Sequence, residues 1–222
     1  MNEESPMTKM TVDFVSDVSC PYCLMGLLAL EVALERTSDV VEPQFRFHPY
    51  QLNPNMPPEG ESLAANLNRK FGVSAADVRN GCAQGTQRVA ALGFTMNYSD
   101  ASGIYNTHDA HRLLHWAGLQ GRQLELKRLL FAAYFSKGLN PSDHGVLIDA
   151  AAEAGLDRQA AREVLSSGRY DEDVHTDEHL WRSRGVNGVP FIMINGSHAI
   201  SGSQLPQQYE STLRQLASER AA

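Results

Sequence analysis

The sequence predicts an α/β protein in which a β-α-β unit and a later β-β-α unit enclose a long run of helices. Two observations predict this class. Apolar and polar side chains alternate near the start of the chain, as in half-buried strands, and a short apolar run followed by a hairpin signal lies near its end. Nearly every segment between these two regions has helical spacing. The length of 222 residues suits one large domain or a domain that carries a sizeable insertion.

The first unit begins with a strand predicted over Met10–Val15, with Val12 and Phe14 on one face. A turn follows at Ser16–Ser19. A helix is predicted from Pro21 to about Arg36, because the segment is rich in Leu, Ala and Glu, and proline suits the first turn of a helix.

A second strand is predicted over Gln44–Tyr50, where alternation returns before a loop rich in Pro and Asn at Asn53–Gly60. From about Ser62 to Arg184 the spacing is helical and glycines separate the segments. Two apolar stripes show the i, i+3, i+4, i+7 pattern of an amphipathic helix. They are Ala110, Leu113, Leu114 and Ala117, and Leu126, Leu129, Leu130 and Ala133.

The last unit begins after Gly185. Pro190–Ile194 is a short apolar run typical of a buried strand, and Asn195-Gly196 is a strong two-residue hairpin signal. The partner strand is predicted at His198–Ser201 and a final amphipathic helix from about Leu205 to Ser218.

Charge and hydropathy argue against several classes of partner. The chain is 42% hydrophobic, as globular proteins are, and its net charge is −7 without a basic cluster. It is therefore a poor candidate for binding nucleic acid or an anionic membrane, which need Lys and Arg opposite phosphate. No apolar run approaches the ~20 residues of a membrane span, and the first residues lack a secretory signal. We expect a cytoplasmic monomer or homodimer.

The cysteines give the strongest chemical signal. The chain has three of them, and two form the sequence Cys20-Pro21-Tyr22-Cys23. Three cysteines do not form a secreted disulfide framework, and in a reducing compartment such a pair is typical of redox or metal chemistry. A zinc site would need further ligands close by, and Cys82 has no cysteine partner near it. We interpret Cys82 as a small core residue in a closely packed helix.

The predicted position of Cys20 explains how the pair would react. At a helix N-terminus, unpaired N–H groups and the helix dipole favour a thiolate. We expect Cys20 to be the exposed nucleophile and Cys23, one turn further along, to be the shielded residue that resolves the mixed disulfide. No metal, flavin or nucleotide is required for this chemistry, and we assign no metal ligand.

A second signal lies at Gly185–Phe191, where Val189-Pro190 opens a strand after a glycine-containing turn. Together with Cys20–Cys23 and the β-β-α tail, it resembles the thioredoxin superfamily. The resemblance implies a cis bond between Val189 and Pro190 that faces the cysteine pair. It also implies that the Val189 backbone, Pro190 and the Pro21-Tyr22 dipeptide contact an extended thiol substrate.

The long helical insertion resembles the DsbA-like group, and the finer pattern is similar to its cytoplasmic FrnE-like subfamily. The resemblance implies a thioredoxin-like domain formed by residues 8–60 and 186–222 and an inserted helical domain at 61–185. It rests on five segments in order: Asp13–Cys23, Asn106–Leu113, Phe131–Phe135, Gly185–Phe191 and Ile200–Gln204. Pro-Tyr replaces the subfamily's usual Pro-Trp, so the direction of electron flow stays open.

The same architecture occurs in 2-hydroxychromene-2-carboxylate isomerases and kappa-class glutathione transferases, which use serine at the first position to stabilise glutathione. A glutathione site carried over from them would lie at the Val189 main chain and the Ser203-Gln204 turn. Cys20 argues against that chemistry as the main one. Resemblance alone places Asn106, His108 or Arg112 at the border of the substrate groove.

Three other polar features remain ambiguous from sequence. His108, His111 and His115 lie on the helix side opposite its apolar stripe, where they could bind metal or overhang the redox cleft; a polar surface is the favoured interpretation. Asp13 lies opposite Val12 and Phe14, so we assign it no proton-transfer role. Asp17 is expected to cap the turn.

The sequence thus predicts a thiol–disulfide oxidoreductase that acts on protein or glutathione disulfides, with glutathione or another thiol as co-substrate. The enzymatic alternative is a glutathione-dependent isomerase or transferase. The non-enzymatic alternative is a redox-responsive or metal-buffering binding protein.

Overall fold

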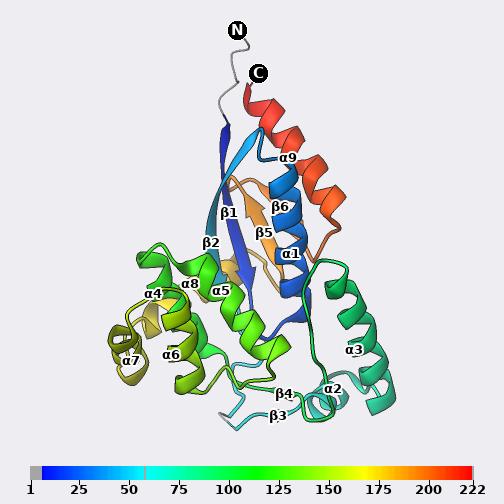
Figure 1. The fold of residues 1–222 in the computed structure, drawn as a ribbon, viewed down its shortest axis with the longest axis vertical. Helices are drawn as coiled ribbons and strands as arrows, with labels where there is room; N and C mark the ends of the chain where they lie inside the picture. Colours follow the sequence, from blue (N-terminus) through cyan, green and yellow to red (C-terminus); the bar gives the residue numbers. More distant parts are fainter. Residues whose placement is uncertain (1–6, 58, 222) are drawn as a thin grey trace.

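A four-stranded mixed sheet forms the centre of the computed structural model, which describes residues 7–57 and 59–221 (Figure 1). Its order is β2-β1-β5-β6; β1 and β2 run parallel, and β5 is antiparallel to both β1 and β6. This arrangement confirms the predicted β-α-β and β-β-α units. The strands are β1 (Thr8–Ser16), β2 (Val41–Pro49), β5 (Phe191–Ile194) and β6 (His198–Ser201).

Two helices from opposite ends of the chain, α1 (Pro21–Arg36) and α9 (Pro206–Ala221), pack against each other beside this sheet (Figure 1). The predicted bounds of α1 are confirmed, whereas β1 and β2 begin two or three residues earlier than alternation indicated. Val12 and Phe14 are fully buried on one face of β1, in one cluster with residues of α1 and α9.

The helices between the two units form two groups (Figure 1). The first contacts α1, and the second packs around its own apolar cluster and against β2. Phe131, from the second group, and Phe135, four residues later, belong to the same cluster as the sheet. The first group is α2 (Leu63–Phe71) and α3 (Ala75–Ala90); the second is α4 (His108–Leu119), α5 (Gln123–Phe131), α6 (His144–Glu153), α7 (Arg158–Ser166) and α8 (Asp171–Ser183). The division at residues 61 and 185 stays a prediction.

The segment between the two units is not entirely helical. Two short strands, β3 (Glu61–Ser62) and β4 (Gly103–Ile104), pair with each other, and Ala132–Ser136 continues α5 as a π-helix. Two residues are too few to show alternation, and a π turn keeps nearly helical spacing, so neither feature has a periodicity of its own.

The hairpin between β5 and β6 follows the prediction from Asn195-Gly196. Both residues have positive φ, 53° and 68°, as a type I′ turn requires. The Asn195 side chain also accepts a hydrogen bond from the Thr11 backbone N–H at 3.1 Å, which fixes the hairpin beside β1. Within the described ranges, we find no helix that combines the length and the apolar character needed to cross a bilayer.

Candidate active site

Cys20 lies where β1 delivers the chain to α1. It is the N-cap residue of α1, with extended backbone angles. Its Sγ accepts a hydrogen bond from the Cys23 backbone N–H at 3.4 Å and lies 3.6 Å from the carbonyl oxygen of Val189, to which the S–H can donate. An N-cap sulfur in this position faces the unpaired N–H groups of the first turn, which favour negative charge.

The loop opposite Cys20 has a cis bond between Val189 and Pro190, as the family resemblance implied. Gly26 lets α1 approach this loop closely. A Cβ at Gly26 would lie 3.1 Å from Cγ of Pro190 and 3.6 Å from the Tyr209 hydroxyl. The two chain segments that the sequence singled out are therefore packed together.

A cavity of about 580 Å³ opens over Cys20. Cys20 itself is only 3% exposed, so the expectation of an exposed sulfur is wrong: the sulfur is recessed and a ligand reaches it through the cavity. The walls come from the start of α1, the loop after β2, α2, α3 and Val189. Pro21 and Tyr22 line it, as expected, whereas Pro190 is buried and does not. Three of the lining side chains are exposed and apolar: Tyr22, Leu52 and Phe71.

Cys23 is fully buried beneath Cys20, as the sequence predicted. Burial raises the pKa of the Cys23 thiol well above its usual value, and the contact with Cys20 raises it further. The nearby Lys127 ammonium acts in the opposite direction. Cys23 is therefore a protonated thiol at neutral pH unless a neighbouring group removes its proton.

Three buried titratable residues accompany the pair: Asp17 from the turn before α1, His111 from α4 and Lys127 from α5. Asp17 accepts hydrogen bonds from the backbone N–H groups of Ser19 at 3.3 Å and Leu52 at 2.8 Å. His111 Nε2 lies 3.6 Å from Asp17 Oδ1. The turn-capping role predicted for Asp17 is confirmed, and the carboxylate also ties the turn to the loop after β2.

Burial disfavours the charged form of each of these three side chains. It opposes ionisation of Asp17, but the hydrogen bonds that the carboxylate accepts outweigh it, and the pKa of Asp17 lies below its usual value. Burial lowers the pKa of His111, so its imidazole is neutral at pH 7. Burial also lowers the pKa of Lys127 to about 8, although the nearby Cys23 and Asp17 favour its charged form. Lys127 is thus a buried amine that gains and loses its proton near neutral pH.

Comparison with known proteins agrees with this geometry. A sequence model of the DSBA-like thioredoxin domain matches residues 11–214. The chain belongs to the DSBA-like thioredoxin domain family. It is 25% identical over 200 residues to the uncharacterized protein YwbO of Bacillus subtilis (strain 168), a match that covers 89% of this chain and 92% of YwbO.

Two solved structures extend the comparison. The probable DsbA oxidoreductase SCO1869 from Streptomyces coelicolor superposes with a TM-score of 0.85 and 28% identity, over 95% of this chain and 91% of that one. A 2-hydroxychromene-2-carboxylate isomerase superposes with a TM-score of 0.69 and 17% identity, over 95% and 98%. The predicted DsbA-like class is confirmed; the FrnE-like assignment stays a prediction.

In this DSBA-like chain, several residues proposed for substrate binding lie away from the Cys20 cavity. Ser203 and Gln204 form the turn before α9, where Gln204 donates through its side chain to the Ser201 carbonyl at 3.2 Å. Asn106 donates to the carbonyls of Pro54 at 3.0 Å and Met56 at 3.2 Å. None of the three lines the cavity, so we assign them no contact with a substrate bound there.

Arg112 is almost fully buried and does not reach the cavity either. Its guanidinium donates to Asp109 Oδ1 at 2.7 Å and to the carbonyls of Val164 at 2.6 Å, of Arg169 at 2.9 Å and of Ser167. Five donors in a rigid fork suit this set of acceptors. Arg112 therefore fixes the loop between α7 and α8, and the groove position expected for it is wrong.

The histidines predicted to form one polar face are separated. His111 is 3% exposed and faces Asp17, because α4 is covered on several sides and not only along its apolar stripe. His115 lies beside Tyr170, and His108 bonds to Asp171 at 2.6 Å. The polar-face interpretation is wrong for His111, and the three side chains do not form a common site.

Cys82 also differs from the prediction. It is half-buried in the wall of the Cys20 cavity and not in the core. The glycines on either side of Cys82 are not required by close packing: a Cβ at Gly85 would make an ordinary 3.5 Å contact with the Met25 side chain, and a Cβ at Gly81 would meet nothing within 4 Å. Periodicity cannot distinguish a helix face that packs on the core from one that borders a cavity.

Lys127 was not among the residues predicted for the site. A signal was present, because Lys127 precedes Leu130 and Phe131 by three and four residues and therefore shares their helix face. A lysine at such a position is ordinarily interpreted as a snorkelling surface residue.

Proposed function

We propose that the chain is a thiol–disulfide oxidoreductase that uses Cys20 as nucleophile and Cys23 as resolving thiol. The Cys20 thiolate attacks one sulfur of a substrate disulfide, and the other sulfur leaves as a thiolate that takes a proton. Cys23 then loses its proton and attacks Cys20 Sγ, which releases the second substrate thiol. The substrate is reduced by two electrons and the chain ends with a Cys20–Cys23 disulfide.

One observation carries this proposal. Cys20 Sγ is the N-cap acceptor of α1, lies 3.6 Å from the Val189 carbonyl and forms part of the cavity wall. A ligand sulfur in the cavity would meet Cys20, whereas Cys23 is fully buried and does not line the cavity. The Val189 backbone is in place to pair with an extended substrate.

The cycle closes when glutathione or another thiol reduces the Cys20–Cys23 disulfide, or runs in reverse if the substrate is a dithiol. It requires no further cofactor. We place it in the cytoplasm, on protein or glutathione disulfides and without nucleic acid or membrane partners, in a monomer or homodimer.

The test is disulfide reduction by the full chain and by two variants, with a peptide disulfide as substrate and glutathione as reductant. Cys20→Ser is expected to abolish exchange, because the attacking sulfur is lost. Cys23→Ser is expected to accumulate a mixed disulfide at Cys20, visible by mass spectrometry as one covalently attached substrate half. Exchange that survives Cys20→Ser would overturn the proposal.

The same variant separates the alternatives. A glutathione-dependent isomerase or transferase of the serine-using kind would keep its activity in Cys20→Ser. A metal-buffering role would show as stoichiometric zinc bound by the reduced cysteines and lost in both cysteine variants.

The reduction potential of the pair in glutathione buffers gives the direction of electron flow. A value near about −270 mV would indicate a reductant, and one near about −120 mV an oxidant. Because 30 mV is worth about 1.4 kcal/mol for a two-electron couple, the two outcomes are well separated.

A further inference from the structure

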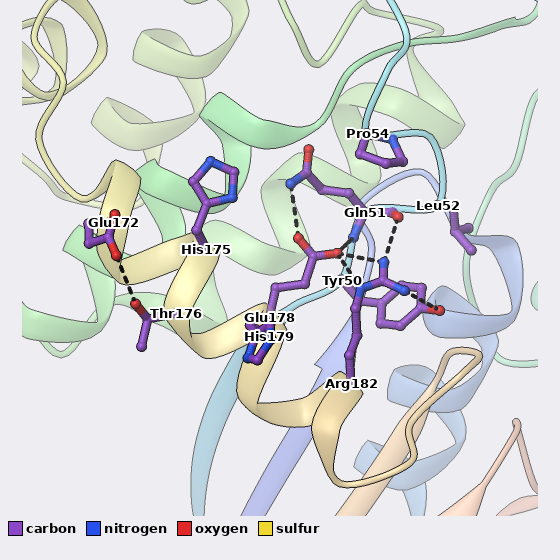
Figure 2. Close-up of a pocket in the computed structure, with 10 residues that line it drawn as sticks. All are labelled: Tyr50, Gln51, Leu52, Pro54, Glu172, His175, Thr176, Glu178, His179 and Arg182. Carbon is purple, nitrogen blue, oxygen red and sulfur yellow. Dashed lines mark hydrogen bonds and ion pairs between the residues drawn. The ribbon is translucent and has the colours of Figure 1, made fainter.

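A second hollow, of about 880 Å³, lies between the end of β2 and helix α8 (Figure 2). Its floor is a closed polar network: Glu178 accepts from the Gln51 backbone and side chain at 2.8 and 3.0 Å, and Arg182 donates to Glu178 at 2.7 Å and to the Tyr50 hydroxyl at 3.0 Å. These floor groups satisfy one another. His175 also lines the hollow; its side chain projects from α8 away from this network (Figure 2).

His175 belongs to a group of three metal-ligating side chains. One ligand atom each of His108, Asp171 and His175 lies within 4.8 Å of the other two. Asp171 and His175 are four residues apart on α8 and so share one face of that helix, while His108 is the first residue of α4. The two imidazole rings are stacked with centroids 4.8 Å apart. In the ranges 7–57 and 59–221, no other set of three such residues is this close.

We propose that His108, Asp171 and His175 bind a divalent transition-metal ion of the Zn²⁺ type. Two imidazoles and one carboxylate suit Zn²⁺ and its neighbours, whereas Mg²⁺ and Ca²⁺ prefer oxygen ligands alone. Metal–ligand bonds of about 2.0–2.2 Å place the ligand atoms of one ion ~3.5 Å apart, so the three side chains must close by about 1 Å. Asp171 is 53% exposed and His175 is exposed, so both can rotate to do so.

The surroundings both oppose and support a cation here. Arg112 Nε lies 3.5 Å from Asp171 Oδ1, which disfavours a second positive charge, but its guanidinium is already paired with Asp109 at 2.7 Å. Glu172 and Asp173 follow Asp171 in the first turn of α8, and both are exposed. The local charge is therefore acidic overall.

The ion would replace the hydrogen bond that now joins His108 Nε2 and Asp171 at 2.6 Å, while Gln51 Nε2 lies 3.4 Å from Nδ1 on the other side of the His108 ring. Three protein ligands leave a fourth position of a tetrahedral ion for water or for a donor group of a molecule in the hollow. The site would connect the start of α4 to the first two turns of α8, and of its three ligands His175 lines the hollow.

The test is calorimetric titration of the tag-free full chain with Zn²⁺, with Cys20, Cys23 and Cys82 changed to Ser so that thiolates cannot bind the ion. One equivalent is expected to bind. His108→Ala and His175→Ala should each weaken binding by at least about ten-fold, because the loss of a residue that only hydrogen-bonds to a metal ligand already lowers metal affinity about ten-fold or more. His179→Ala is the matched control, because His179 lines the same hollow from the next turn of α8 but is outside the cluster; its affinity should be unchanged.

A second measurement keeps the cysteines in place. Co²⁺ absorption of the unaltered chain separates thiolate ligands, which give an intense near-ultraviolet band, from nitrogen and oxygen ligands, which do not. The site is supported if the Co²⁺ spectrum saturates at one equivalent and lacks the thiolate band, and if this spectrum is absent in His175→Ala. Absence of binding in both measurements, or binding indifferent to His108 and His175, would overturn it.

Discussion

Lys127 is a buried lysine whose charge influences the cysteine pair. It is fully buried, its Nζ lies 5.0 Å from the centre of the Phe131 ring, and its charge lowers the pKa of Cys23. With a pKa of about 8, part of the Lys127 population is neutral near physiological pH and can accept a proton. We therefore expect Lys127, from a helix far along the chain, to take the proton that Cys23 must lose in the proposed resolving step.

We therefore expect Lys127→Met to slow the resolving step. Loss of the ammonium lets the Cys23 pKa rise further, and each unit of rise lowers the thiolate fraction about ten-fold at neutral pH. The decay of a preformed mixed disulfide at Cys20, followed by stopped flow at pH 7, measures this step. Arg128→Met, which removes an exposed cation of the same helix, should leave the decay unchanged. Equal rates in both variants would contradict the role of Lys127.

The same substitution should also affect stability. An ordinary lysine pKa of 10.5 falls to about 8 in the folded chain, which corresponds to about 3 kcal/mol against folding below pH 8. Between pH 8 and 10.5 the unfolded chain binds more protons, so stability rises with pH and the penalty disappears. Lys127→Met should be more stable by up to about 3 kcal/mol at pH 7, with a smaller gain at pH 10. Urea unfolding at both pH values tests this, and a gain independent of pH would contradict it.

At the scale of elements, His48 joins the sheet to the helical insertion. On β2, it lies between Asp13 of β1, 3.0 Å from Nε2, and Asp177 of α8, 2.8 Å from Nδ1. Burial opposes protonation of His48, but these two carboxylates outweigh it and raise its pKa above the usual value. A charged imidazole donates to both carboxylates at once, so protonation strengthens the contact between β1, β2 and α8.

His48→Gln is therefore expected to reduce stability most at low pH. A raised folded-state pKa gives stability that is fully present below the unfolded value of about 6.5 and is lost as pH rises through the folded value. At pH 6 we expect a loss of roughly 2 kcal/mol, the size of a charge-assisted hydrogen bond, and a smaller loss at pH 9. Thermal unfolding at both pH values measures it, with His179→Gln, an exposed histidine of α8, as control. A larger loss at pH 9 than at pH 6 would contradict the assignment.

For the molecule as a whole, local sequence patterns predicted the strands of the sheet, and they also predicted the place of the cysteine pair at the start of a helix. Alternation, the Pro21 helix start and Asn195-Gly196 are properties of neighbouring residues, so they can be seen in the sequence. The contact of Val189 with Cys20 came from family resemblance. The cavity and the Asp17–His111–Lys127 cluster arise from packing between elements far apart in sequence, which periodicity does not encode.

The cavity shows most clearly what depends on the whole molecule. The thioredoxin-like part supplies Cys20 and Val189, and α2 and α3 supply the opposite wall, including Cys82. A large side chain at Cys82 should therefore obstruct substrates without touching the cysteine pair. We expect Cys82→Trp to lower the rate of Cys20 with a peptide disulfide by at least about ten-fold, since small misplacements of a reacting sulfur are costly.

Two controls isolate the cause. Cys82→Ser removes the same thiol without adding bulk, and Arg79→Trp adds the same bulk to α3 at an exposed position outside the cavity wall. Both should react as the unaltered chain does. If Cys82→Trp reacted normally while its unfolding transition matched that of Arg79→Trp, substrates would approach Cys20 by another route, and α2 and α3 would have no part in binding them.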